Sequence, residues 1–440
     1  MKRFLVLIMI AVMLIGLCAC GEKKPETAAK EPAAFQVGFG RVNINGSGAL
    51  PLAGYGDAND RMSQGMLDYI STTCIAITDE KGETVLLYTS DHIGTNTAWI
   101  EDLRVAITEI TGVPAERIML SATHSHSAPD VREVITFNHP YYQVFKNCLV
   151  QAGKLAMEDR SKATVSSGST TVEGLNFDRH LIMSDGGVAG DNFGNKSTAK
   201  PVSNHHESDK EVQMIRFARG DKKDILMMNF QVVPKLASTG TTQYGLDNRP
   251  MMSADVVGAT RDYVEKNGDV LCAYYQGAGA NLNPLDSYIK EQNTSAQDTL
   301  SNYGAALGGA VVKALPNLKE MAVTPLITTK QTALQCEKAE GGTVAAEINA
   351  ICLGDIGFAT APFELFDTTG MQIKKDSPFE TTFIIGYANG GFSYVPPAEV
   401  WDYNTTDGSI AFELTKCIFK QGTAEQTVQE LLSMLNGLAG

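Results

Sequence analysis

The stretch Arg117–Pro129, which reads RIMLSATHSHSAP, decides the fold that we expect of this chain. Its first part, Arg117 to Ser121, is an apolar run of strand length. Two β-rich runs precede it, Cys74 to Asp79 and Thr84 to Thr89, and a helical pattern at Trp99 to Thr111 separates them from it. Strands that alternate with helices are typical of layered α/β domains. We therefore predict an α/β fold of layered β-sheets with flanking helices.

The alternation of strands and helices continues to the end of the chain. We expect, in order, strands within 212–233, a helix at Val256–Lys266, a strand at Val270–Tyr275, a helix at Asn302–Ala314, a strand-rich part from Val323 and a helix at Ala424–Leu435 with Thr423 as its N-cap. Residues 184–210 are rich in Gly, Asn, Asp, Ser and His, which predicts a long surface excursion. No internal repeat is evident. The sequence thus predicts a single large domain over residues 35–440.

The first residues have the order of a secretory signal. Lys2 and Arg3 precede an apolar run from Phe4 to Leu17, which is shorter than the roughly 20 residues of a membrane span. Leu17-Cys18-Ala19-Cys20 resembles a bacterial lipobox, in which the cysteine takes a diacylglycerol. We expect a signal peptide at 1–19, a lipidated, disordered tether at 20–34 and anchoring at Cys20 to the outer face of a bacterial membrane. An ordinary signal peptide cut nearby and a short anchor are the alternatives.

Composition limits the possible partners and the redox chemistry. The formal net charge is −14 and no long basic run occurs, which argues against nucleic acid as a partner. Six cysteines follow Cys20 without a CxxC pair: Cys74, Cys148, Cys272, Cys336, Cys352 and Cys417. Buried free thiols are the favoured interpretation, although an exported protein can also oxidise a pair.

Two histidines directly follow the predicted strand at Arg117–Ser121. In an extended chain His124 and His126 project on the same side, because strand side chains alternate with a period of two. This spacing suits metal binding or paired acid and base catalysis. Two surface polar groups at a strand end are the alternative. The position after a buried strand, among small polar residues, favours a functional loop.

The histidine pair belongs to a series of motifs that runs along most of the chain. The series resembles the amino-terminal domain of the neutral/alkaline, non-lysosomal ceramidase family, and the resemblance extends from Gly38 to about Leu435. Its segments are, in order, Pro51–Gly56, Leu87–Asp91, Thr123–Pro129, Asn176–His180, Ser253–Asp255 with Gly258, Gln276–Pro284, Pro362–Phe366 and Gly386–Val395. The resemblance implies a metal-dependent hydrolase of amide bonds.

In that family a zinc ion is held by two histidines, a glutamate and a tyrosine. The resemblance implies that His124, Glu364 and Tyr394 are zinc ligands, that His126 shuttles a proton, and that Arg179 faces the carbonyl oxygen of the substrate. Glu364 has an alternative role as a cap of a helix near Phe366, and Tyr394 has one as a packed core residue. Asp91 and Asp255 are candidates for a second shell or for purely structural hydrogen bonds.

One ligand position departs from the family pattern. The second zinc histidine of the family falls in a strand that reads Asn-Phe-Gln-x-His-Pro, whereas this chain has Val233 in Asn229–Pro234. Valine cannot bind zinc, so the site has three ligands, a substitute ligand or no activity. The adjacent residues His205 and His206 are the candidate substitutes, and solvation of both in a polar loop is the alternative.

Three functions follow from these observations. The first is a surface-anchored, zinc-dependent hydrolase of an N-acyl amide bond in ceramide or another lipid-like small molecule. The second is a catalytically degenerate relative that binds an envelope lipid, peptide or sugar, which Val233 favours. A serine hydrolase is the weakest, because no Gly-x-Ser-x-Gly elbow occurs and Ser127 beside His126 is not an activated nucleophile.

Overall fold

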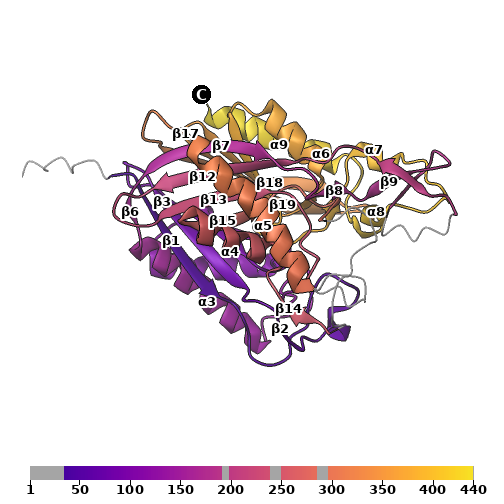
Figure 1. The fold of residues 1–440 in the computed structure, drawn as a ribbon, viewed down its shortest axis with the longest axis horizontal. Coiled ribbons are helices and arrows are strands. Elements are labelled where there is room, and N and C mark those ends of the chain that lie inside the picture. The colour runs from indigo at the N-terminus through magenta and orange to yellow at the C-terminus, as the bar shows by residue number, and fades with distance from the viewer. Residues whose placement is uncertain (1–33, 191–197, 238–248, 285–295, 440) are drawn as a thin grey trace, which may run out of the picture. The chain divides into compact units, whose positions relative to one another are not determined.

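The computed structural model describes residues 34–190, 198–237, 249–284 and 296–439. The expected signal peptide and almost all of the expected tether lie outside these residues. The described residues from Ala34 onward belong to one compact unit. It is a mixed α/β structure, which confirms the predicted fold class (Figure 1).

Three larger sheets build the unit. The first has the order β5-β4-β3-β1-β6 and contains β1 (Gln36–Asn43), β3 (Ser71–Thr78), β4 (Thr84–Ser90), β5 (Ile118–Ala122) and β6 (Ser161–Lys162). The second has the order β15-β13-β12-β7-β17 and contains β7 (Thr164–Thr171), β12 (Glu211–Ala218), β13 (Asp224–Phe230), β15 (Val270–Gln276) and β17 (Lys319–Glu320). The third has the order β18-β19-β20-β22 and contains β18 (Ile327–Glu337), β19 (Thr343–Leu353), β20 (Ile356–Thr360) and β22 (Thr381–Ile385).

The three sheets share one topology. In each, three successive antiparallel strands are followed by a helix and then by a fourth strand that pairs in parallel with the third. The connecting helices are α2 (Ile100–Thr111), α4 (Asp255–Gly268) and α6 (Asp367–Asp376), and the longer helices that follow each fourth strand are α3 (Pro140–Glu158), α5 (Ala296–Ala314) and α9 (Thr423–Leu438). The same order of strands and helices therefore occurs three times within the unit.

This threefold pattern is a repeat of architecture, which the sequence does not reveal as an internal repeat. The repeat lies in the order and direction of strands, and it needs only alternating apolar side chains, which many sequences provide. The connections between corresponding elements differ in length and content, so the copies do not align as sequence. The predicted strands and helices themselves are confirmed, with shifts of a few residues at their ends.

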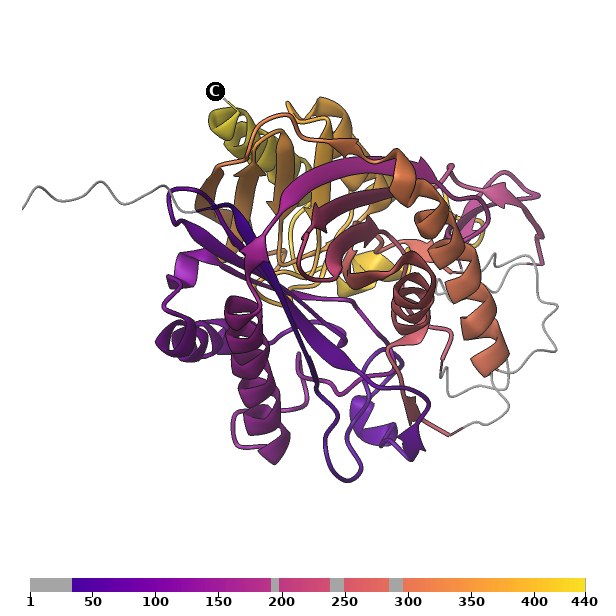
Figure 2. The ribbon, with the colours of Figure 1, turned by 60° about the vertical axis from the view of Figure 1, so that its left-hand side comes forward.

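The strands are apolar on both faces because each sheet is buried on both faces, and successive side chains alternate between them. On β3, Ile75 and Ile77 point into a core that all three sheets share, whereas Cys74 and Ala76 pack toward α2 and α3. The second sheet packs its outer face on α4 and α5, and the third packs its own on α6 and α9. Figure 2 shows these helices on the outside of the sheets.

The segment expected as a surface excursion contains regular structure. β9 (His180–Met183), β10 (Val188–Gly190) and β11 (Pro201–Asn204) form a three-stranded sheet, and residues 191–197 lie outside the described residues. Short pairs complete the fold: β2 (Gly65–Met66) with β14 (Met251–Met252), β8 (Phe177–Asp178) with β16 (Leu282–Asn283), and β21 (Glu364–Leu365) with β23 (Tyr394–Val395). Two short helices are α7 (Ala398–Trp401) and α8 (Phe412–Lys416).

One cap was predicted wrongly. The N-cap of α9 is Gly422 at φ +96°, and Thr423 is the first helical residue, whose Oγ1 donates a hydrogen bond to the Lys420 carbonyl. Glycine adopts this left-handed conformation without steric cost, so the turn before the helix places the cap one residue earlier.

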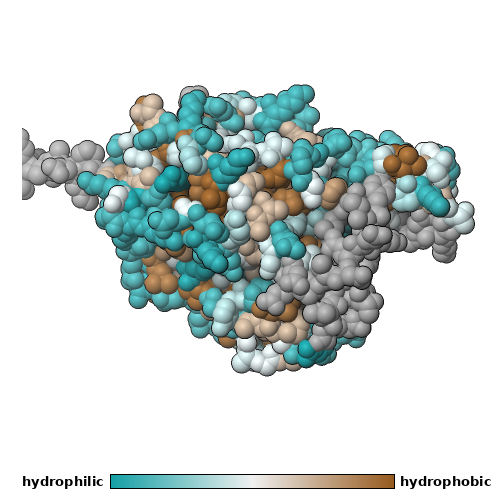
Figure 3. All heavy atoms as spheres, viewed as in Figure 1, coloured by the Kyte–Doolittle hydropathy of each residue, from teal (hydrophilic) through white to brown (hydrophobic). Residues whose placement is uncertain are grey.

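The surface and the cysteines agree with the composition. The face in Figure 3 is mainly hydrophilic, with hydrophobic residues scattered over it. Among the described residues, no helix has the length and apolar character needed to cross a membrane. The six cysteines after Cys20 are free thiols, as expected; four are buried, and Cys148 and Cys417 are half-buried.

Candidate functional site

His124, Val233 and Glu364 each follow a strand of the parallel pair in one of the three sheets. His124 comes after β5, and Glu364 comes after β20 in the third sheet. The segments after these strands are joined by backbone hydrogen bonds: His126 N–H to Pro234 O at 3.0 Å, Ala122 N–H to Tyr387 O at 3.2 Å, and Ala280 N–H to Leu365 O at 3.0 Å. The carboxyl ends of parallel strands are where α/β folds commonly place ligands.

A cavity of about 640 Å³ opens where these segments meet. His124, His126, Arg179, Glu364 and Tyr394 all line it. The structure thus brings together the five residues that the sequence proposed for the metal and the chemistry. The volume of the cavity is within the range of small-molecule sites in proteins.

His124 is held in one orientation from two sides. Its Nδ1 bonds to the Ile93 carbonyl at 2.7 Å, which assigns the proton to Nδ1 and leaves a lone pair on Nε2. Its ring stacks on Tyr387 with centroids 4.1 Å apart, and its backbone has φ +65°, an uncommon conformation for a non-glycine residue. Burial lowers the pKa of His124 to about 4, so the ring is neutral at pH 7.

Glu364 faces the free nitrogen of His124. Its Oε2 lies 3.4 Å from His124 Nε2, and its Oε1 accepts a hydrogen bond from Arg132 Nη1 at 2.9 Å. Although burial lowers the pKa of Arg132, the Glu364 carboxylate outweighs it and raises that pKa. Glu364 lies on β21, and the N-cap of α6 is Phe366, so the alternative role as a helix cap is wrong.

Arg132 reaches Glu364 through a narrow passage. A Cβ on Gly391 would lie 2.9 Å from Arg132 Cδ, so glycine at this position leaves room for the guanidinium stem. Arg132 lines the cavity, yet nothing in the sequence marked it, because it lies outside every motif of the series.

Tyr394 and Arg179 form another wall of the cavity. The Arg179 Nη2 lies 3.5 Å from Tyr394 Oη, and Glu413 on α8 fixes the guanidinium, with Arg179 Nε donating to Glu413 Oε1 at 2.7 Å. Burial, followed by the Glu364 carboxylate, raises the pKa of Tyr394 above its usual value. Glu413 is 0% exposed and was not expected at the site, since it falls in none of the motif segments.

His126 completes the inner wall. Its Nε2 lies 3.4 Å from His124 Nε2, and its ring meets Tyr55 edge-on with centroids 5.2 Å apart. Gly54, at φ +103°, passes so close that any side chain there would overlap the His126 ring. Burial, and then neighbouring His124, hold the pKa of His126 well below its usual value.

The donor set fits a zinc ion on chemical grounds. Imidazole nitrogen and carboxylate oxygen are common zinc ligands, and His124 Nε2 and Glu364 Oε2 converge on each other with their remaining groups held from behind. Within the described residues, Glu364 Oε2 is buried and accepts no hydrogen bond. A buried carboxylate oxygen without a donor leaves a position at which a cation can bind.

Val233 lies where the second sheet approaches the cavity. It follows β13, is 1% exposed, and its N–H donates to Leu282 O at 3.0 Å. The next residue, Pro234, accepts the hydrogen bond of the His126 backbone. The segment after β13 is thus joined through its backbone to the loop that carries His126, although Val233 itself does not line the cavity.

Asp91 and Asp255 have structural partners. Asp91 accepts two hydrogen bonds from Arg261, at 2.9 and 2.7 Å, and one from the Ser71 backbone. Asp255 accepts the backbone N–H groups of Leu236 and Ala237, and so fixes the segment after Val233. Both carboxylates therefore order the loops around the cavity, and neither lines it.

His205 and His206 do not line the cavity either. His206 lies between two carboxylates, with Nδ1 2.9 Å from Asp178 and Nε2 2.9 Å from Asp367. Burial lowers its pKa, but these ion pairs outweigh burial and raise the pKa of His206 to about 11. The geometry gives no support to their role as substitutes for the histidine missing at position 233.

The remaining histidines have local roles. His92 Nε2 bonds to Thr95 Oγ1 at 2.8 Å, His139 caps α3, and His180 pairs with Glu413 at 3.2 Å. None of the three lines the cavity.

The three repeated sheets, with the cavity at their carboxyl ends, form an α/β fold that is also found in solved neutral ceramidase structures. Two solved structures have this fold, described as neutral ceramidase from Pseudomonas aeruginosa and as a ceramidase complexed with C2. They match with TM-scores of 0.74 at 15% and 14% identity, and each match covers 92% of this chain and 75% of the other. No family model and no curated protein matches the sequence.

Proposed function

We propose that this chain is a zinc-dependent hydrolase of N-acyl amide bonds, anchored through Cys20 at the outer face of a bacterial membrane. The observation that carries the proposal is the convergence of His124, His126, Arg179, Glu364 and Tyr394 on one cavity. The ceramidase fold supports the choice of an N-acyl amide as the bond that is cleaved.

His124, Glu364 and Tyr394 are the residues that would hold the zinc ion. A bound zinc supplies a Lewis acid for the amide carbonyl and lowers the pKa of water toward neutrality. The protein supplies the orientation, because the Ile93 carbonyl fixes the tautomer of His124 and Arg132 fixes the carboxylate of Glu364.

His126 and Arg179 carry the remaining roles. The neutral His126 ring, 3.4 Å from His124 at the cavity wall, accepts a proton from the attacking water and returns it to the leaving amine nitrogen. Arg179, held by Glu413, presents a fixed positive charge where negative charge develops on the carbonyl oxygen. Because Glu413 holds the guanidinium in place, Arg179 needs no reorganisation during the reaction.

The apolar part of the cavity lining favours a lipid-like substrate. Phe392, Phe412 and Ile418 line the cavity together with Lys416, whose Nζ lies 5.7 Å from the centre of the Phe412 ring. Apolar side chains in the same cavity as the buried polar residues suit an acyl chain attached to an amide. Attachment to a membrane would keep the enzyme close to such substrates.

The test is hydrolysis combined with metal analysis of the full chain. We expect zinc in the cavity, hydrolysis of N-acyl sphingosine or another N-acyl amine that a chelator abolishes, and loss of both on His124→Ala. His139→Ala is the matched control, because it removes a histidine that only caps α3. A protein that keeps the same zinc content and hydrolysis in His124→Ala would contradict the proposal.

A second candidate function is binding without catalysis. Val233 stands where a ligand is missing, and Arg132 already forms an ion pair with Glu364. The Glu364 carboxylate is therefore balanced without a metal. In this second candidate function, the zinc-free protein binds a lipid, peptide or sugar of the envelope. Calorimetry with N-acyl lipids in chelator, and absence of hydrolysis in both wild type and Val233→His, would favour this function.

A further inference from the structure

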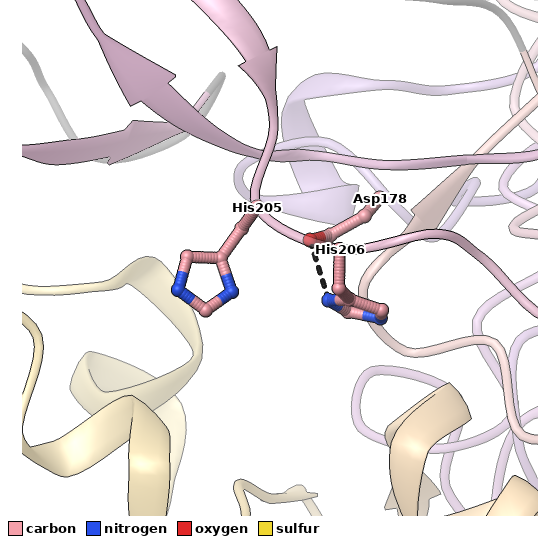
Figure 4. Close-up of side chains that lie close together, drawn as sticks. All are labelled: Asp178, His205 and His206. Atoms are coloured by element: carbon pink, nitrogen blue, oxygen red, sulfur yellow. Dashed lines mark ion pairs between the residues drawn. The ribbon is translucent and has the colours of Figure 1, made fainter.

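A second group of metal-binding side chains lies outside the cavity. One ligand atom from each of Asp178, His205 and His206 lies within 4.8 Å of the others. Figure 4 shows both rings at the end of β11, with the Asp178 carboxylate beside His206. Two imidazoles and a carboxylate form a ligand set that zinc uses in proteins.

The backbone around these residues is fixed. His205 N–H donates to His180 O at 2.7 Å, and the Asn204 side chain donates to Asp178 O at 2.7 Å. β8, which ends at Asp178, pairs with β16, and β11 pairs with β9. Asp178 is therefore placed by sheet pairing, and His205 and His206 directly follow a paired strand, so that backbone hydrogen bonds support the ligands.

The groups behind the ligands have the arrangement of an outer shell. His206 Nδ1 faces Asp178 Oδ2 at 2.9 Å, while its other nitrogen is bonded to Asp367 at 2.9 and 3.0 Å. Asn281 donates one hydrogen bond to Asp178 Oδ1 and one to Asp367, so it joins the two carboxylates. Metal-binding histidines usually bond a carboxylate or carbonyl through their second nitrogen, and Asp367 has this position.

Access differs between the ligands in a useful way. Asp178 is 1% exposed, whereas His205 and His206 are partly exposed. An ion can therefore enter from the histidine side and meet the carboxylate at the bottom. A buried anchor with an open entry path is what a binding site requires.

We propose that Asp178, His205 and His206 bind a divalent cation of the zinc class, which takes the place of the Nδ1 proton of His206 and releases that proton to solvent, while Asp367 keeps its bond to Nε2 and orients the ring. The ion fixes the segment Asp178–His180, whose central residue, Arg179, lines the cavity. The site thus positions Arg179. It does not depend on the proposed hydrolase function, because none of its ligands lines the cavity.

The test counts zinc in the full chain after chelation and dialysis against trace zinc. The proposal expects one zinc that is lost on His205→Ala and kept on His124→Ala, with Asp367→Asn weakening its binding roughly 10–100-fold. His205 is the best position for the first variant, because its 3.5 Å contact with Tyr403 is weaker than the ion pairs of His206. His139→Ala again controls for the loss of a histidine.

The outcomes separate this site from the cavity. A zinc that His205→Ala removes and His124→Ala does not supports this inference, whether or not the cavity holds another. Unchanged zinc content in folded His205→Ala, with loss only on His124→Ala, overturns the inference and supports the proposed function. Equal zinc affinity of wild type and Asp367→Asn also overturns it, and thermal melts of each variant establish that it is folded.

Discussion

The cavity and the Asp178 cluster each contain two histidines and a carboxylate, but their surroundings are opposite. In the cavity, the histidine nitrogens face one another and Glu364, while Arg132 and Arg179 supply positive charge. In the cluster, His206 lies between Asp178 and Asp367, so negative charge surrounds it. The same residue types thus have positively charged neighbours in the cavity and negatively charged neighbours in the Asp178 cluster.

The difference appears in the pKa values. Burial lowers the pKa of His124 to about 4, and the ion pairs raise the pKa of His206 to about 11 despite burial. At neutral pH the first ring is neutral and the second is cationic in the metal-free protein. A histidine count alone therefore does not reveal function, because the neighbouring charges decide what each ring does.

The largest expected effect is on catalysis. His126→Ala should lower hydrolysis by about 10²–10⁴-fold at an unchanged cavity zinc content, because a proton-transferring side chain contributes that much. Initial rates with an N-acyl substrate, measured beside zinc analysis, provide the check. If His205→Ala lowered the rate as much as His126→Ala, the division of roles between the two regions would be wrong.

With a chelator present, the free energy of unfolding should fall in acid because of His92 and in alkali because of His206. Burial lowers the pKa of His92, next to the cavity, to about 4 from 6.5, so its contribution to stability is complete above pH 6.5 and is lost as the pH falls toward 4. The loss is on the order of 3 kcal/mol for such a shift. The raised pKa of His206 gives the reverse: its contribution is complete below pH 6.5 and is lost as the pH rises through about 11.

Denaturant unfolding across this pH range measures both limbs. His92→Gln should make the acid limb shallower and leave the alkaline limb unchanged, since the unfolded chain then gains one proton fewer while His124 and His126 still contribute. An acid limb that is as steep in His92→Gln as in His139→Ala would show that other groups dominate it.

A smaller effect is expected at Val233. Val233→His places a larger ring in a buried site, so the metal-free variant should lose about 1–3 kcal/mol of unfolding free energy. Added zinc should restore that stability and raise hydrolysis, because the second sheet then contributes a ligand. Thermal melts with chelator and with zinc measure the change, and equal destabilisation under both conditions would mean that position 233 does not reach the metal.

Much of the fold and part of the cavity were predictable from the sequence. The strands around Cys74, Thr84 and Ile118 have alternating or continuous apolar patterns, and local patterns identify such elements well. The convergence of His124 with Glu364 followed from the family resemblance, since no local pattern relates residues 240 positions apart.

The partners that tune the site were not predictable. Arg132 and Glu413 are ordinary charged residues in sequence, and only the packing of distant loops brings them to Glu364 and Arg179. The link of His206 to Asp178 and Asp367 likewise depends on β11, a strand in a segment that has the composition of a loop. Contacts between distant segments carry no signal in a single sequence.

The threefold pattern separates what holds this molecule together from what it does. Each sheet packs against its own helices on one face and against the common core on the other. Only a few residues beyond the last strands of each sheet reach the cavity. A substitution at one of these positions alters the chemistry of the cavity while leaving the architecture intact. Stability and chemistry therefore depend on largely separate sets of residues in this molecule.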